Sequence, residues 1–117
     1  MGIESAPVDW EQLDMMADGY TPDFVEIYEE FLALTPAMLD ALETHLAAGN
    51  VDAAREAAHK VKGSSANFGF LGVSQPMAEI EHEAKVNLSL EGSSGRMLEA
   101  RKNFESARAE IRTKRGI

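Results

Sequence analysis

A run of regularly spaced apolar residues between positions 24 and 46 constrains the fold more than any other feature of the chain. Its members recur every three or four residues, as on one face of an α-helix: Phe24, Ile27, Tyr28, Phe31, Leu34, Met38, Leu42 and Leu46. A start signal precedes this run, because Thr21 can cap a helix and Pro22 suits its first position. We predict a helix from about residue 22 to about residue 48, kinked or split where Pro36 removes a backbone hydrogen bond.

Helical repeats also occur on either side of this long segment. Asp9 can cap a short helix that runs to about Ala17 and is stopped by Gly19. The residues expected on its inward side are Trp10, Leu13 and Met16 or Ala17. Downstream, Gly49-Asn50 ends the long helix and caps a further helix from about Val51 to Phe68.

The second half of the chain predicts two more helices. One follows Gly72 and runs to about Leu88 with Pro76 in its first turn, and the other follows the flexible loop 89–95. The expected inward residues are Val73, Met77, Ile80, Ala84 and Leu88 in the first helix, and Met97, Ala100, Phe104, Ala107 and Ile111 in the second. No segment shows the alternation of a β-strand. We therefore predict an all-α fold, an antiparallel up-down four-helix bundle with a short extra N-terminal helix.

The composition limits the classes of function. A chain of 117 residues fits one domain, which we expect over residues 9–113, with a disordered or frayed stretch 1–8 and a tail 114–117. The absence of cysteine excludes disulfides and cysteine-ligated metals, and the formal net charge of −9 makes nucleic acid and anionic membranes poor partners. No apolar stretch reaches the roughly 18 residues of a membrane span, and no signal pattern begins the chain. A cytoplasmic location is the default expectation.

The predicted helix 51–68 has two faces of different character. At about 100° per residue, the arc expected to be buried holds Ala54, Ala57, Ala58, Val61, Ser65 and Phe68, with Ser64 at its edge. The opposite arc holds His59, Lys62, Gly63 and Ala66. Neutral imidazole is nucleophilic near pH 7 and can take a phosphoryl group from an aspartyl phosphate. Lys62 is placed to offset the added charge, and Gly63, which costs about 1 kcal/mol relative to alanine in a helix, leaves room for a partner.

These residues carry a resemblance to a known family. The motif consists of His59, Lys62, Gly63, Ser64 and Ser65, followed by Phe68-Gly69. It resembles the H-x-x-K-G-S/A signature of histidine-containing phosphotransfer (HPt) domains, and the flanking apolar pattern is similar over roughly residues 9–113. The resemblance implies a two-component phosphorelay carrier in which His59 accepts a phosphoryl group from a receiver-domain aspartate and passes it to another receiver.

The resemblance also implies the partners. These are response-regulator receiver domains, which supply the Mg²⁺, and a hybrid sensor kinase, whereas this chain needs no cofactor of its own. The chain is then a covalent phosphotransfer intermediate that does not use ATP, and whether it counts as an enzyme stays open. We expect a monomer. The phosphorylatable histidine domain of a kinase is a close alternative.

Glu81 is the second candidate for the site. It lies at the boundary of the apolar arc of the fourth helix, about 60° from the centre of that arc, and can face the helix that bears His59. A carboxylate bonded to Nδ1–H would fix the tautomer and leave Nε2 free to attack, and the resemblance implies the same role. An ordinary surface or ion-pairing acid is the alternative, and Pro76 departs from the family pattern. The residues expected to dock a partner are Gly63, Ser64, Ala66 and Phe70.

Two other classes of function fit parts of the pattern. A bundle that binds a partner without carrying phosphate would use the same face. The E-x-x-H pairs that end at His59 and His82 are typical of di-iron carboxylate bundles, but both lie opposite the apolar arcs, so we expect no metal site. We interpret His45 and His82 as surface residues and leave the roles of Ser64 and Ser65 open. The basic residues Arg108, Arg112, Lys114 and Arg115 are interpreted as a solvated helix end.

Overall fold

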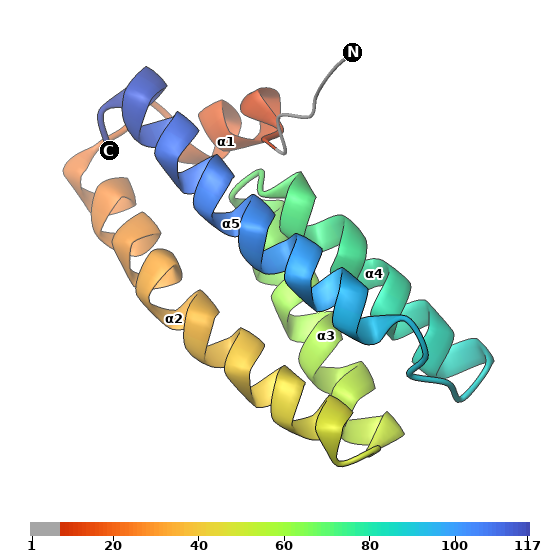
Figure 1. Cartoon of the computed structure of the whole chain (residues 1–117). Helices are drawn as coiled ribbons and strands as arrows, with labels where there is room; N and C mark the ends of the chain where they lie inside the picture. Colours follow the sequence, from red (N-terminus) through yellow and green to blue (C-terminus); the bar gives the residue numbers. More distant parts are fainter. Residues whose placement is uncertain (1–7) are drawn as a thin grey trace.

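The computed structural model describes residues 8–117, and within them it contains five α-helices. They are α1 (Trp10–Ala17), α2 (Pro22–Ala47), α3 (Val51–Asn67), α4 (Leu71–Val86) and α5 (Ser93–Arg115). The four long helices run antiparallel to their chain neighbours as a bundle, and α1 lies across the end at which α5 finishes (Figure 1). The described residues contain no β-strand, only an isolated bridge between Val8 and Phe70. The predicted all-α bundle with a short extra helix is confirmed.

Side-chain caps set the starts of the first three helices, as the sequence predicts. Asp9 accepts a hydrogen bond from the backbone N–H of Gln12 at 3.1 Å. Thr21 accepts one from Phe24 at 3.2 Å, and Asn50 accepts one from Ala53 at 3.2 Å. Each cap satisfies a backbone donor that has no partner inside its own helix.

Pro36 does not split α2, so that part of the prediction is wrong. The helix runs through Pro36 as one element of 26 residues. The predicted inward stripe also needs correction, because Ile27 and Leu34 are 50% and 60% exposed while Thr35 and Leu39 are buried. The hydroxyl of Thr35 is accommodated in the core because it donates to the carbonyl of Phe31 at 2.7 Å.

The start of α4 differs from the prediction in a way that bears on the site. The helix begins at Leu71, which places Pro76 beyond the first turn. Proline has no N–H to donate to the carbonyl four residues earlier, which belongs to Gly72. The side chain of Asn103 on α5 donates to that carbonyl at 3.0 Å instead. At the other end, Leu88 lies outside the helix and is 72% exposed, contrary to its predicted inward position.

Aromatic side chains fill the core where α3 meets the turn into α4. The rings of Phe31 and Phe68 are stacked with their centroids 4.5 Å apart. The ring of Phe70 stands edge-on to Phe31 at 4.9 Å, and its centroid lies 5.6 Å from that of Phe104. These contacts fix the C-terminal end of α3, because Phe68 and Phe70 follow directly after that helix.

Both ends of the described segment, residues 8–117, pack on the bundle. The predicted frayed stretch 1–8 lies outside the described residues except for Val8, which is buried, so fraying is wrong for that residue. The backbone N–H of Asp9 donates to the carbonyl of Gly69 at 2.7 Å. Helix α5 continues to Arg115, and Ile117 packs against the core, so the predicted tail 114–117 is part of the fold.

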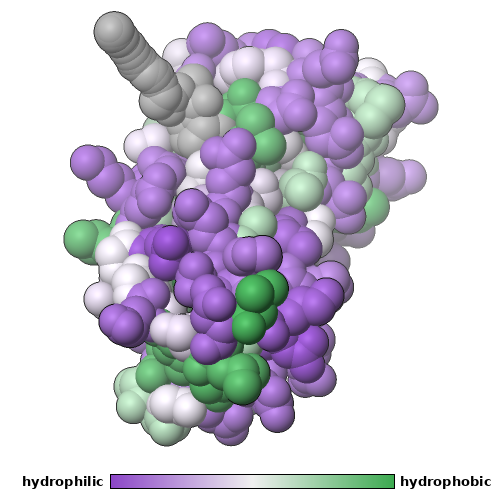
Figure 2. Space-filling view, turned by 90° about the vertical axis from the view of Figure 1, so that its right-hand side faces the viewer, coloured by the Kyte–Doolittle hydropathy of each residue, from purple (hydrophilic) through white to green (hydrophobic). Residues whose placement is uncertain are grey.

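The surface of the bundle is largely polar. Figure 2 shows a mostly hydrophilic face on which hydrophobic side chains gather in a few patches. The large apolar side chains that remain exposed are Met15, Met16, Ile27, Leu34, Val86, Leu88 and Leu98. Of the helices in residues 8–117, none combines the length and the apolar character that a membrane span requires.

Candidate functional site on the third helix

Helix α3 divides into a buried and an exposed side close to the predicted division. Ala54, Ala58, Val61 and Ser65 are buried, whereas Ala57 and Ser64 are half-buried. His59, Gly63 and Ala66 are exposed on the other side. Small side chains on the buried side let α3 approach its neighbours closely and direct His59 outward.

The ring of His59 is held at one nitrogen. Its side chain is 65% exposed, and Nδ1 lies 2.7 Å from Oε2 of Glu81 on α4. An ionised carboxylate only accepts hydrogen bonds, so Nδ1 carries the proton in this pair. A neutral ring then has its lone pair on Nε2, and among residues 8–117 no hydrogen bond to Nε2 is found. The arrangement leaves a nucleophilic nitrogen open to solvent.

Glu81 binds Lys62 as well as His59. Nζ of Lys62 lies 2.5 Å from Oε1 of Glu81, so each carboxylate oxygen has a different partner. Burial alone raises the pKa of Glu81, but the hydrogen bonds from Lys62 and then His59 outweigh it and bring the pKa below its usual value. The carboxylate is therefore ionised at neutral pH. Lys62 is one turn from His59, as predicted. The sequence analysis did not predict that its ammonium group pairs with Glu81.

The position of Glu81 depends on how α4 packs. Its neighbours Met77, Ile80 and Ala84 are buried, which turns Glu81 to the edge of the helix that faces α3. Pro76 does not disturb this register, because Asn103 supplies the hydrogen bond that Pro76 cannot make. The contact between His59 and Glu81 thus joins two residues that are 22 positions apart in the chain.

Gly63 leaves open space beside the ring. A Cβ atom built at this position would meet nothing within 4 Å. Ser64 is directed back to its own helix, since its hydroxyl donates to the carbonyl of Val61 at 3.3 Å. The buried hydroxyl of Ser65 has no hydrogen-bond partner among the described residues. Within residues 8–117, neither Ser64 nor Ser65 is hydrogen-bonded to His59.

Phe70 was predicted as a docking residue and the structure corrects this. Its side chain is fully buried among the core aromatics, because the turn after α3 folds it inward rather than outward. Phe70 lies beyond the predicted helix 51–68, so helical spacing gave no information on whether its side chain faces inward.

The surface beside His59 includes residues of α2 that the sequence analysis missed. A hollow of about 470 Å³ is lined by Arg55, Glu56, His59, Lys60 and Glu81. A second hollow of about 290 Å³ shares Glu56 and Lys60 with the first, and its other lining residues are Met38, Ala41, His45, Ala53 and Ala57. The only sequence signal for these residues of α2 was the apolar spacing of that helix, which assigned Met38 wholly to the core. In the structure Met38 is half-buried at the edge between α2 and α3.

The E-x-x-H pairs do not converge. Glu79 lies 3.5 Å from Arg96, Glu56 and His82 are exposed, and His59 is bonded to Glu81. Over residues 8–117, no group of three or more His, Cys, Asp or Glu side chains is arranged to hold a metal ion. The geometry favours chemistry at an exposed imidazole over chemistry at a bound metal.

Comparison with known families gives one match. The family model described as Hpt domain matches residues 26–111. The match covers more than half of the chain, and its span contains His59, Lys62 and Glu81. No curated protein and no solved structure matches the chain.

Proposed function

The chain belongs to the Hpt domain family, and on this basis we propose that His59 is the residue that carries the phosphoryl group. Histidine phosphotransfer within a phosphorelay is the activity of this family, and its members interact with receiver domains. The observation that supports His59 is its exposed ring, held at Nδ1 by Glu81 at 2.7 Å while Nε2 faces solvent. His45 and His82 have no carboxylate partner among the described residues.

The proposed transfer is a displacement at phosphorus. Nε2 of His59 attacks the phosphorus of a receiver's aspartyl phosphate, so that a P–N bond forms while the P–O bond to the aspartate breaks. The electron pair of that bond leaves on the aspartate carboxylate. Nδ1 keeps its proton, and the ring becomes a phosphoimidazolium whose positive charge is stabilised by Glu81. A second receiver takes the group by the reverse displacement.

Lys62 supports the charge that arrives with the phosphoryl group. A phosphoryl group brings close to two negative charges at neutral pH, and the chain as a whole has a formal net charge of −9. The ammonium of Lys62 lies 2.5 Å from the carboxylate of Glu81, which also binds His59. In this proposal, the positive charge of Lys62 offsets part of the negative charge of Glu81 and of the phosphoryl group.

The proposed docking surface surrounds His59 on the side of α2. It consists of Gly63 and Ala66 on the exposed side of α3, and of Met38, Ala41 and Ala57 at the edge between α2 and α3, all at least partly exposed. Small and apolar side chains permit close approach of another protein around the charged site. In this scheme a receiver domain supplies the aspartate and the Mg²⁺, a hybrid sensor kinase loads the relay, and the chain acts as a cytoplasmic monomer without a cofactor or ATP.

The test is transfer of labelled phosphate from a phosphorylated receiver domain. Wild type is expected to take up label and His59→Gln to take up none, while both retain the same helical circular dichroism. His82→Gln is the matched control, because it removes an exposed helical histidine outside the site. Equal labelling of wild type and His59→Gln would show that His59 is not the acceptor.

A further inference from the structure

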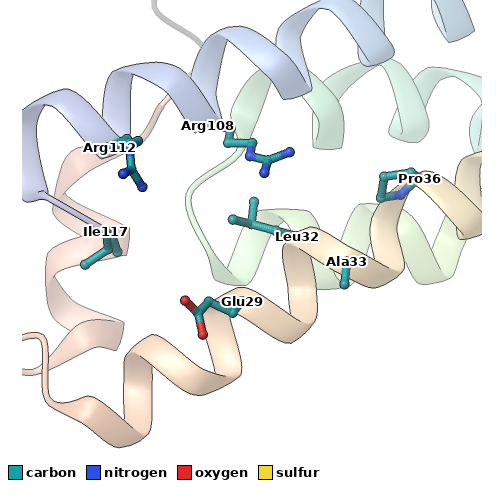
Figure 3. Close-up of a pocket in the computed structure, with 7 residues that line it drawn as sticks. All are labelled: Glu29, Leu32, Ala33, Pro36, Arg108, Arg112 and Ile117. Carbon is teal, nitrogen blue, oxygen red and sulfur yellow. The ribbon is translucent and has the colours of Figure 1, made fainter.

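A groove lies between α2 and α5, away from the edge where α3 and α4 bring His59 and Glu81 together. Its volume is about 580 Å³, and it is lined by Glu29, Leu32, Ala33, Pro36, Arg108, Arg112 and Ile117. Figure 3 shows Arg108 and Arg112 projecting from α5 toward α2, with Leu32 and Glu29 projecting from α2 toward α5. Two cationic side chains therefore face a wall that is apolar at Leu32, Ala33 and Pro36 and acidic at Glu29.

The two arginines of the groove lack acidic partners within residues 8–117. Arg96, Arg101 and Arg115 all pair with acidic side chains at 3.5 Å or less, whereas Arg55, on the hollow beside His59, has no such pair within residues 8–117. Arg108 and Arg112 form no such pair there, although Glu29 lines the same groove. A helix C-terminus attracts cations, but this effect is confined to the last turn, and Arg108 lies about two turns before Arg115. Arg108 and Arg112 are both exposed, as predicted for a solvated helix end, but Arg108 lies beyond the reach of the helix terminus.

The opposite wall of the groove offers apolar contact. Leu32 and Pro36 are half-buried, and Ile117 closes one end. Pro36 also removes the N–H that would otherwise donate to the carbonyl of Leu32. The groove thus presents hydrogen-bond donors on α5 and apolar surface on α2, which suits a ligand that is anionic on one side and apolar on the other.

From this arrangement we propose that the groove between α2 and α5 binds an acidic and partly apolar peptide segment of a partner protein. Carboxylates pair with guanidinium groups by two parallel hydrogen bonds, which favours arginine over lysine at such a site. The chain as a whole is acidic, with 20 Asp and Glu against 11 Lys and Arg, so most of its surface repels an acidic ligand, whereas the two arginines of the groove outnumber its single acidic residue, Glu29.

The spacing of the arginines indicates the form of the segment. Residues four apart on a helix are separated by about 6 Å along its axis. Alternate residues of an extended chain lie about 7 Å apart on one side, and the residue between them points to the other side. An extended acidic–apolar–acidic sequence therefore places two carboxylates on Arg108 and Arg112 and its apolar side chain on Leu32 and Pro36.

The experiment measures binding of a fluorescein-labelled peptide of alternating Glu and Leu to the full chain by fluorescence anisotropy. Wild type is expected to bind saturably. The double variant Arg108→Gln/Arg112→Gln is expected to bind at least tenfold more weakly. Lys85→Gln/Lys102→Gln is the matched control, because it removes two positive charges from exposed positions outside the groove and is expected to bind within about twofold of wild type.

Each remaining outcome speaks against the proposal. Absence of saturable binding would overturn it, and so would an equal loss in both double variants, which would indicate attraction to overall charge. Binding of inorganic phosphate that competes fully with the peptide would show a site for simple anions. Self-association in sedimentation that disappears only in the arginine variant would make a second copy of the chain the occupant. Phosphotransfer at His59 is expected to be unchanged in the arginine variant, so the two proposals fail independently.

Discussion

At the scale of single residues, the site consists of an imidazole, an ammonium and one carboxylate that contacts both. Glu81 fixes the ring of His59 and at the same time neutralises Lys62. We therefore expect the proposed phosphotransfer to depend on Glu81 as well as on His59.

Replacing Glu81 by Gln tests its positioning role. Glutamine can still accept a hydrogen bond from Nδ1–H but carries no charge to stabilise the phosphoimidazolium. Hydrogen bonds to charged groups contribute about 1.5–3 kcal/mol, so we expect phosphotransfer to slow by about tenfold or more. The rate is measured by rapid-quench labelling from a phosphorylated receiver. Glu83→Gln, on the same helix, is the control, and an unchanged rate in Glu81→Gln would remove Glu81 from the mechanism.

The pH dependence of stability provides a second check on Glu81. Its pKa is lowered in the folded state, so its contacts stabilise the fold above the ordinary carboxyl pKa of about 4.3 and this contribution is lost as the pH falls through the lowered value. We expect wild type to exceed Glu81→Gln in unfolding free energy at pH 6 and the difference to shrink below about pH 4. Urea titrations at a series of pH values measure it. A difference that grows toward acid would contradict the assigned direction of the pKa shift.

Gly63 tests whether open space is needed beside His59. A side chain fits there without contact, so Gly63→Gln is expected to stabilise the chain by about 0.5–1 kcal/mol through helix propensity. It is also expected to weaken receiver binding and leave phosphorylation of His59 by the small donor phosphoramidate intact. Gly63→Ala gives a comparable gain in stability with little obstruction. Receiver affinity that is equal in wild type and Gly63→Gln would show that the space is not needed.

At the scale of the helices, caps and periodic spacing could be predicted from sequence because they are local. Asp9, Thr21 and Asn50 act within three residues of themselves. The position of Pro76 beyond the first turn of α4 could not be predicted, since Asn103, from another helix, donates to the Gly72 carbonyl that Pro76 leaves without its helical partner. The burial of Phe70 was missed for a similar reason, as a turn and its distant core contacts decide it.

The pairing of Asn103 with Gly72 predicts a coupling between two positions. Asn103→Ala leaves a buried carbonyl without its donor and is expected to lower the unfolding free energy by about 1–2 kcal/mol. In a Pro76→Ala background the backbone N–H of residue 76 can donate to Gly72, so the same substitution should cost less. A double-mutant cycle in urea measures the coupling. Equal costs in the two backgrounds would show that Asn103 does not substitute for the missing donor.

At the scale of the whole molecule, the bundle separates two surfaces of different chemistry. The α3–α4 edge carries His59 and the paired charges, whereas the α2–α5 groove carries Arg108 and Arg112 without acidic partners in residues 8–117. Helical spacing predicted that His59, Lys62 and Gly63 lie on the same side of α3, because these residues belong to one helix. The groove between α2 and α5 depends on how closely these two helices pack, and no local sequence pattern predicts that distance.

In the proposed phosphotransfer, the phosphoryl group resides on Nε2 of His59. The most direct measurement is nuclear magnetic resonance of the ¹⁵N-histidine-labelled chain after transfer from a phosphorylated receiver, which identifies both the residue and the ring nitrogen bonded to phosphorus. We predict one phosphorylated histidine, His59, bonded through Nε2, with Nδ1 still protonated. Phosphorus on Nδ1, on His45 or His82, or on no histidine at all would contradict it.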